Sequence, residues 1–522
     1  MRKFKNPSII LILIFFLFIT IFVTKSFITM TNVPFYDFDE AHRAENAKRM
    51  KEYRSFLVPL TGSSQDRVEH LKIPLKENPD FYLYYHLERP PLIYDMMILS
   101  TSVFGSAEWV YRLPSFLLGL MILIVFYIFA KMERPSNYLA ISAGLLSLIT
   151  SADLWLSSQY AQMDTAITFF LTLSLLTLII FCQTRKSLLL YLAGIFLGLG
   201  LLSKLQPATI FIFPLLYLLM TRKLNILDLI KFGTGFFLIF GPWLLYLVVR
   251  FGLKDVLLIM PGFAITSASI DDIHHKAPFF WYIRWWWDTL RPGWTIFLAL
   301  FFYDVIYKLL DWEKRTLLVY IFGGLLAFSI PDNKIWWYVL PLIPAVSYYI
   351  FLSVNDYIQK EQKRIANLSF AMIVASLPIF LQSSNLISMI YGISITGIVF
   401  LILIDKLSIK IDLRLNKKFI FYISIILSLL MFSLQFPKII PYHWNVKPVA
   451  QSYKSLPYPK CLWLGDMPGE AVLFYSNAGE VPILNKTTQI YTNCKNNYLI
   501  TPDKYKGGEL ILRKGNIRLY KL

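Results

Sequence analysis

Long apolar runs separated by short polar loops make up most of the chain. The first extends from Pro7 to Val23, directly after a short basic head. Many of the runs approach the ~20 residues that a helix needs to cross a bilayer. We therefore predict about thirteen transmembrane helices, counting the first. The later runs lie at residues 110–130, 138–152, 163–182, 188–202, 205–220, 232–250, 293–310, 316–330, 335–354, 366–382, 386–404 and 418–436.

Lysine and arginine gather in alternate loops between these runs. The basic groups are Arg2/Lys3/Lys5, Lys131/Arg134, Arg185/Lys186, Arg222/Lys223/Lys231, Lys308/Lys314/Arg315, Lys360/Lys363/Arg364 and Lys406/Lys410/Arg414/Lys417/Lys418. The short loops of the other set, 153–162, 203–204, 331–334 and 383–385, contain only Lys204 and Lys334. Short cytoplasmic loops carry the excess of basic residues. The N-terminus is therefore predicted to be cytoplasmic, and the first loop, 31–109, to lie outside.

Two stretches of this first outer loop predict helices that do not cross. Residues 89–104 are apolar, but Asp95 interrupts them and a crossing here would reverse the side of every later basic loop. Pro90 and Pro91 suit the first turn of a helix that lies along the membrane surface. Residues 40–54 predict a second interfacial helix, which is polar and basic on most faces.

The composition shifts after the last apolar run. From residue 437 to residue 522 the chain is mixed, with short alternating runs at 460–464, 471–475 and 509–513 between turn residues. We divide the chain into a membrane domain, 1–436, with a second outer loop at 251–292, and a small α/β domain, 437–522. Thirteen crossings place this domain outside, where Cys461 and Cys494 could form a disulfide.

Composition narrows the class of protein. Hydrophobic residues make up 56% of the 522 positions and charged residues 16%, which excludes an ordinary soluble protein. The net charge of +18 does not indicate nucleic-acid binding, because the basic residues lie between apolar runs and not on one face. The fold class is therefore an α-helical polytopic membrane protein.

Candidate chemistry lies in residues 35–43, immediately after the first apolar segment. Three carboxylates, a histidine and an arginine occur within positions 37–43. Charged groups at a membrane surface are costly to hold and are commonly functional. Asp39 has a second interpretation, as the N-cap of a helix beginning at Glu40.

Several motifs together resemble the polyprenyl-phosphate-dependent glycosyltransferases of the C-type fold, a superfamily that includes protein O-mannosyltransferases and bacterial lipid A aminoarabinose transferases. The motifs are Asp39-Glu40 before an interfacial helix, residues 88–94, 112–115, 159–165 and 200–204, and Lys334 to Pro341. The resemblance covers about residues 30–350. The C-terminal region resembles the family only in its position and size.

The resemblance implies an inverting transfer of a sugar from a polyprenyl-phosphate donor, such as one built on undecaprenyl phosphate, to an acceptor outside a bacterial cytoplasmic (inner) membrane. The acceptor classes are lipid A, another cell-surface glycan or lipid, and a protein. The candidate catalytic residues are Asp39, Glu40 and Glu88, which could also coordinate a divalent metal ion. Glu88 has a second interpretation, as the partner of Arg89 in a surface ion pair.

Cations are needed around the departing lipid phosphate. The resemblance places Lys204, Tyr338 and Lys334 as candidates for binding this phosphate. Either His42 or Arg43 is a further candidate, because the family's arginine position is His42 here and Arg43 is one residue further on. Lys204 could instead extend to the outer membrane interface. The candidate residues of the substrate cavity are Arg89, Asp164, His274, His275 and Trp285.

Two other functions fit part of the pattern. A basic polytopic protein could be a transporter or a lipid flippase, but the chain shows no internal repeat of the kind that transporters have. An O-antigen polymerase or ligase is a nearer alternative, although those enzymes usually have their large outer loop late in the chain.

Overall fold

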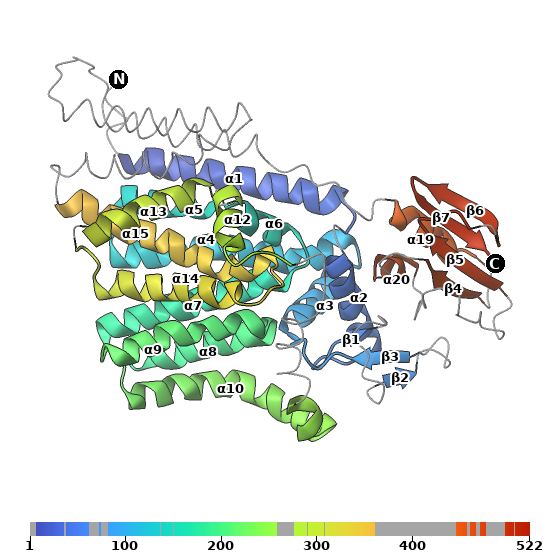
Figure 1. The fold of residues 1–522 in the computed structure, drawn as a ribbon, viewed down its shortest axis with the longest axis horizontal. Coiled ribbons are helices and arrows are strands. Elements are labelled where there is room, and N and C mark those ends of the chain that lie inside the picture. Colours follow the sequence, from blue (N-terminus) through green and yellow to red (C-terminus); the bar gives the residue numbers. More distant parts are fainter. Residues whose placement is uncertain are drawn as a thin grey trace, which may run out of the picture.

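Roughly parallel helices form a bundle, with a smaller group of helices and strands at one of its ends (Figure 1). The computed structural model describes residues 7–35, 38–61, 72–74, 82–135, 137–149, 151–257, 276–289, 291–306, 308–360, 445–456, 460–465, 470–476, 496–505 and 507–522. Helix α1 lies along one side of the bundle in Figure 1 and helix α10 along the opposite side.

The helices of the bundle follow the first ten predicted apolar runs. They are α1 (Pro7–Asn32), α4 (Glu108–Glu133), α5 (Tyr138–Ile149), α6 (Ala152–Gln159), α7 (Met163–Thr184), α8 (Leu188–Ser203), η1 (Gln206–Phe211), α9 (Ile212–Met220), α10 (Ile226–Phe251), α12 (Trp281–Thr289), α13 (Arg291–Ile306), α14 (Trp312–Ser329), η2 (Trp336–Leu342) and α15 (Ile343–Lys360). The last three predicted spans, 366–382, 386–404 and 418–436, lie outside the described residues.

Several of these helices could cross a membrane by length and composition. In the part of the chain that the structure describes, the segments long and apolar enough are α4, α7, α10 and Trp336–Asp356. Helices α5 and α6 together form one more candidate, bent by 57° at a short break. Some apolar helices of the bundle, such as α8, are shorter than a usual span.

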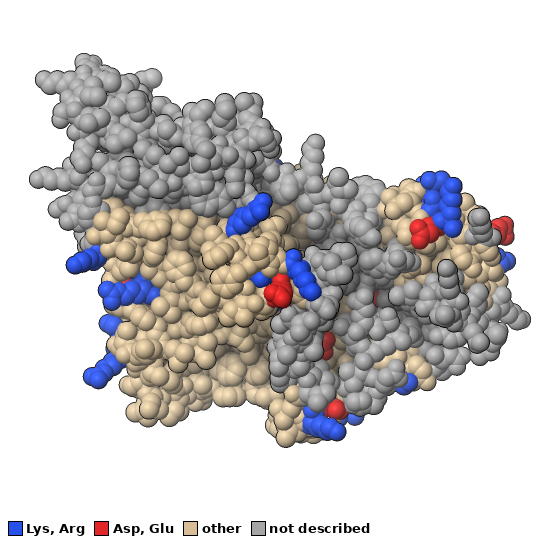
Figure 2. Space-filling model, viewed as in Figure 1, with Lys and Arg blue, Asp and Glu red and all other residues tan. Residues whose placement is uncertain are grey.

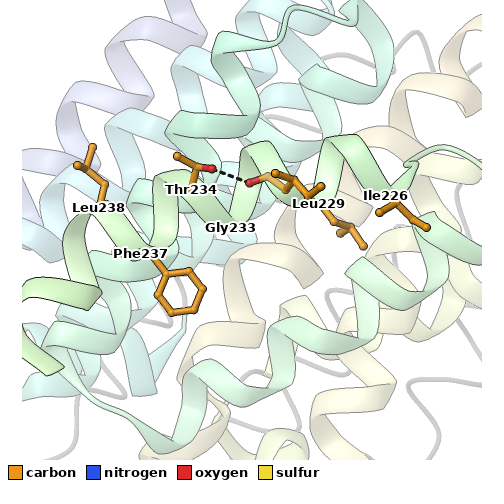
Figure 3. A pocket seen from close by; sticks show the side chains of 7 residues that line it. Ile226, Leu229, Gly233, Thr234, Phe237 and Leu238 are labelled. Atoms are coloured by element: carbon orange, nitrogen blue, oxygen red, sulfur yellow. Dashed lines mark hydrogen bonds between the residues drawn. The ribbon is translucent and has the colours of Figure 1, made fainter. Parts of the chain in front are cut away.

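Small residues allow α8 and α10 to pack closely. A Cβ atom at Gly194 would lie 2.0 Å from the carbonyl oxygen of Phe232, and one at Gly235 would lie 2.1 Å from that of Tyr191. The backbones therefore meet at glycines, as is common between membrane helices, where close van der Waals packing drives association. The opposite face of α10 is apolar and exposed, and the shallow pocket in Figure 3 is lined by residues of this helix alone, such as Ile230 and Phe237.

The predicted basic loops meet at one end of the bundle. The Arg185 guanidinium lies 4.0 Å from the Asp228 carboxylate, and the Lys223 ammonium lies over the Trp312 ring. On the face in Figure 2, lysine and arginine side chains gather at the end of the bundle opposite the C-terminal residues, whereas its side is mostly uncharged. The ends of α7 and α9 and the starts of α10 and α14 therefore share this basic side.

The first outer loop contains both predicted helices. Helix α2 (Phe38–Tyr53) corresponds to the predicted helix at 40–54, and α3 (Leu92–Phe104) begins after Pro90 and Pro91. Leu99, Val103 and Phe104 are exposed on α3, which suits a helix with one face on a membrane. The sequence analysis did not anticipate the three short strands between these helices, β1 (Leu60–Thr61), β2 (Lys72–Pro74) and β3 (Tyr82–Tyr85), which pair antiparallel in the order β1-β3-β2.

The C-terminal residues form a mixed sheet with two helices. The elements are α19 (Val446–Lys454), β4 (Lys460–Leu464), α20 (Glu470–Ser476), β5 (Asn496–Thr501), β6 (Glu509–Lys514) and β7 (Ile517–Lys521). The strand order is β4-β5-β7-β6, with β4 parallel to β5 and the other pairs antiparallel. We call residues 445–522 the C-terminal α/β segment.

Two of the three alternating runs in this segment are strands, but residues 471–475 form helix α20. Ala471, Val472 and Tyr475 are buried, which is the helical spacing and not the alternation of a strand. Cys461 is disulfide-bonded, and its predicted partner, Cys494, lies outside the described residues. Cys182 is a free, buried cysteine.

The C-terminal α/β segment contacts the start of the first outer loop through α20. The Phe474 ring packs edge-on against the buried ring of Phe35, with 4.7 Å between the centroids. The backbone N–H of Phe35 donates a hydrogen bond to the Tyr475 hydroxyl (3.2 Å), which lies 3.3 Å from Glu108 Oε1. Lys447 forms an ion pair with the same Glu108 carboxylate. These contacts hold Phe35 and the start of α4 against the C-terminal α/β segment.

We expect Tyr475→Phe to weaken this contact, because the buried N–H of Phe35 would lose its acceptor. An unsatisfied buried donor costs about 1–3 kcal/mol. The unfolding temperature of the purified protein in detergent should therefore fall. Tyr505→Phe, at an exposed ring of the same segment, is the matched control and should change nothing. Equal unfolding temperatures for both variants would contradict a role for the Tyr475 hydroxyl.

Candidate active site

The first turn of α2 places Asp39 beside a basic residue. The Arg43 guanidinium donates to Asp39 Oδ2 at 2.7 Å, one helical turn along the chain. Helix α2 begins at Phe38, so Asp39 lies in its first turn. Burial would raise the pKa of the Asp39 carboxyl, but the charges of Arg43, Arg89, His42 and Lys204 outweigh it and hold this pKa below its usual value. Asp39 is therefore an ionised carboxylate in a cationic environment.

The neighbouring Glu40 points into the protein and has structural contacts. Its two oxygens accept hydrogen bonds from Arg112 Nε and Nη2, at 2.7 and 2.9 Å, and both side chains are fully buried. Glu40 Oε1 also accepts from the backbone N–H of Ala161 at 2.9 Å. Such a bidentate pair is both strong and directional. Among the three predicted catalytic carboxylates, Glu40 is thus placed to orient α2 and not to face a substrate.

His42, one turn after Asp39 on α2, stacks against His86, which follows β3. The His42 and His86 rings are 5.4 Å apart and nearly parallel, at 11°. His86 Nε2 lies 3.6 Å from Glu88 Oε1 in the turn before α3. With the Asn46 amide oriented by its hydrogen-bonding partners, Asn46 Oδ1 accepts from His42 Nε2 at 2.9 Å. Glu88 is largely buried, and its carboxylate lies beside His86.

Lys204 lies at the turn between α8 and η1, and its ammonium is directed inward. It donates to Asp164 Oδ1 at 2.8 Å, in the first turn of α7. The ammonium also lies 4.8 Å from the Tyr338 ring centroid and 6.0 Å from that of Trp337, which are cation–π distances. Lys204 is buried, so the interpretation of a side chain that extends to the outer membrane interface does not describe this structure.

These groups form one site at the end of the bundle where the first outer loop lies. Asp39 lies within electrostatic range of Arg89 and Lys204, and Tyr338 lies within range of Asp39 and Asp164. Segments far apart in the sequence therefore meet, from α2, the turn before α3, the start of α7, the end of α8 and η2. The result is an ionised carboxylate, Asp39, close to cationic side chains and to the buried Lys204–Asp164 ion pair.

Two predicted residues have other contacts. Lys334 donates to the backbone carbonyls of Ala277 and Pro331, at 2.9 and 2.7 Å, so it connects two loops. The Trp285 indole N–H donates to the buried Asp153 carboxylate at 3.1 Å. In this structure the Lys334 and Trp285 side chains form hydrogen bonds that connect neighbouring segments of the protein. His274 and His275 lie outside the described residues.

The candidate metal ligands do not converge. The Glu40 carboxylate forms an ion pair with Arg112, and the Glu88 carboxylate lies beside His86. Among the residues that the structure describes, no three histidine, cysteine, aspartate or glutamate side chains are close enough to hold a metal ion together.

Arg112 belongs to one of the predicted motifs but had no predicted role, and His86 was not among the predicted residues. Both are polar residues that the structure buries completely. An arginine at the start of an apolar run was a usable signal, because a buried charge in a membrane protein needs a partner. His86 gave no comparable signal, since it directly follows the aromatic run Tyr82–Tyr85 and belongs to none of the predicted motifs.

Comparisons with known proteins agree with the predicted superfamily. Residues 88–246 match the family model described as dolichyl-phosphate-mannose-protein mannosyltransferase. Two proteins of Aquifex aeolicus (strain VF5), both described as uncharacterized, are each 26% identical, over 347 and 329 residues. The two matches cover 63% and 59% of this chain, and 61% and 71% of the relatives, so the chain spans less than two thirds of the first relative's length.

Solved structures show the fold. The crystal structures of ArnT from Cupriavidus metallidurans, in the apo state and bound to undecaprenyl phosphate, match with TM-scores of 0.67 and 0.68 at 15% sequence identity, over 97% of both chains. The Archaeoglobus fulgidus oligosaccharyltransferase matches at 0.51 and 12% identity, over 89% of this chain and 62% of that one. The predicted resemblance to the C-type glycosyltransferase superfamily is confirmed, and the chain has the ArnT fold.

Proposed function

We propose that this chain, with the ArnT fold and a segment similar to the mannosyltransferase family, is an integral-membrane glycosyltransferase. It moves a sugar, with inversion, from a polyprenyl-phosphate donor to an acceptor outside the cytoplasmic membrane. The likeness to ArnT, a structure of which contains undecaprenyl phosphate, supports a donor of this class. The acceptor is lipid A, another cell-surface glycan or lipid, or a protein.

One observation carries the proposal: the Asp39 carboxylate, whose pKa is held below its usual value, lies among Arg43, Arg89 and Lys204 at one end of the bundle. Glycosyl transfer from a lipid phosphate needs a group that accepts the acceptor's proton and cations that stabilise the leaving phosphate. A transporter gives no reason for the two kinds of group to meet beside interfacial helices.

In the proposed reaction the acceptor hydroxyl attacks the anomeric carbon of the donor sugar. A bond forms between the acceptor oxygen and this carbon, while the bond from the carbon to the phosphate oxygen breaks. The bonding electrons leave with the polyprenyl phosphate, and the acceptor proton moves to the Asp39 carboxylate. Lys204, Arg43, Arg89 and the Tyr338 hydroxyl stabilise the phosphate as its negative charge grows.

A transfer assay tests the function. Purified protein in liposomes should move a labelled sugar from an undecaprenyl-phosphate sugar to lipid A or another added acceptor. The same vesicles should show no net movement of the donor across the bilayer. Movement without transfer would contradict the proposal and support a flippase or transporter, and transfer of preassembled glycan chains would support an O-antigen polymerase or ligase.

The topology is a separate prediction. Tags inserted near residues 360 and 410 should be accessible only from the cytoplasm, and a tag at the C-terminus only from outside. These sites follow from the basic loops, which the positive-inside rule places in the cytoplasm. A cytoplasmic C-terminus would show that the number of crossings is even.

A further inference from the structure

The ion pair between Lys204 and Asp164 raises a question that the proposed function does not answer. Lys204 is the cation that would bind the donor phosphate, yet in this structure its ammonium donates to a carboxylate at 2.8 Å. Both side chains are buried, and Asp164 is fully so. A phosphate cannot take the full hydrogen-bonding capacity of Lys204 while this contact is intact.

Asp164 is only partly satisfied. Its Oδ1 accepts from Lys204, but within the described residues its buried Oδ2 has no hydrogen-bonding partner. Asp164 lies in the first turn of α7, where the helix dipole favours a negative charge. One oxygen of Asp164 is therefore bound to Lys204, and the other is available for a further contact.

The charges around Lys204 explain why a carboxylate is needed there. Burial lowers the pKa of the Lys204 ammonium, and Arg43 and Arg89 lower it further, whereas Asp164 raises it. Asp39 already has Arg43 as its close partner. Without a nearby anion, Lys204 would lose its proton more readily and would bind a phosphate less well.

We propose that Asp164 is an internal substitute for the donor phosphate: it holds Lys204 charged in the empty site and is displaced from the ammonium when the lipid phosphate binds. This inference rests on the proposed function. It makes Asp164 a positioning residue that competes with the ligand, so it also favours release of the polyprenyl phosphate after transfer.

Asp164→Asn tests the proposal through binding of undecaprenyl phosphate to the purified full-length protein between pH 6 and pH 9. At pH 6 the variant should bind roughly tenfold more tightly, because a charge-assisted hydrogen bond no longer competes. As the pH rises, the variant should lose binding at a lower pH than the wild type, because the neutral amide no longer supports the ammonium. Lys204→Met should bind weakly, and adding Asp164→Asn to it should change nothing further.

Controls separate this inference from the proposed function. Asp311→Asn, at the N-cap of α14, keeps a good cap and should leave binding unchanged. Should Asp164→Asn not accumulate, Asp164→Ser removes the same charge and carries the same expectation. Unchanged binding at every pH, or weaker binding without a shift along the pH axis, would overturn the inference alone. A wild-type protein that does not bind undecaprenyl phosphate would overturn the proposed function and the inference with it.

Discussion

Asp39→Asn should lower sugar transfer by about 100-fold or more, the lower range for a positioned proton acceptor. The amide has nearly the shape of the carboxylate and can still accept a hydrogen bond from Arg43, so the helix and the donor site should remain intact. The cationic surroundings hold the pKa of Asp39 low, so the wild-type carboxylate is ionised at neutral pH. Its loss should therefore appear in the transfer rate and not in the affinity for undecaprenyl phosphate.

The measurement is the initial transfer rate at saturating donor, with donor binding measured in parallel. Asp95→Asn is the matched control, because it removes another carboxylate of the first outer loop, on α3, and should retain transfer. Full transfer activity in Asp39→Asn would remove the aspartate from the chemistry. The search for the proton acceptor would then turn to Glu88.

Much of the architecture could be predicted because it depends on local sequence. The length of an apolar run determines whether a helix can cross a membrane, and the basic loops determine which ends lie together. The helix predicted at 40–54 and the last residue of the helix predicted at 89–104 agree with the structure for the same reason. The run at 471–475 was misread because five residues do not distinguish a strand from a short buried helix.

The site was harder to predict, because its contacts join distant segments. Sequence proximity grouped Glu40 with Asp39, yet successive helical residues point in directions about 100° apart. Asp39 consequently faces the cationic cluster, while Glu40 faces Arg112, 72 positions further along the chain. Lys334 and Lys204 both looked like outer cations, and only the fold shows that one is bound to backbone carbonyls and the other to Asp164.

Arg112→Met should have the largest effect on stability. Besides Glu40, the guanidinium donates to the carbonyl oxygens of Met30, Val33 and Pro34, at 2.9, 2.6 and 2.9 Å. Arg112 therefore joins the end of α1 to the start of α2. Removing one partner of a buried ion pair typically costs about 3–5 kcal/mol, because the other charge remains buried. We expect the unfolding temperature in detergent to fall by several degrees.

A double-variant cycle separates the ion pair from the contacts with the backbone. The loss of unfolding free energy in the double variant Arg112→Met/Glu40→Leu should be smaller than the sum of the losses in the two single variants, by on the order of 1–3 kcal/mol. The reason is that the double variant leaves no unpaired buried charge. It should still be less stable than the wild type, since three carbonyls and the Ala161 N–H lose their partner. Arg185→Met, at a half-exposed guanidinium, is the control and should change stability by about 1 kcal/mol or less. If Arg112→Met were as mild as this control, the link between α1 and α2 would not depend on the buried pair, and the position of Asp39 would have to come from the packing of α2 and α20.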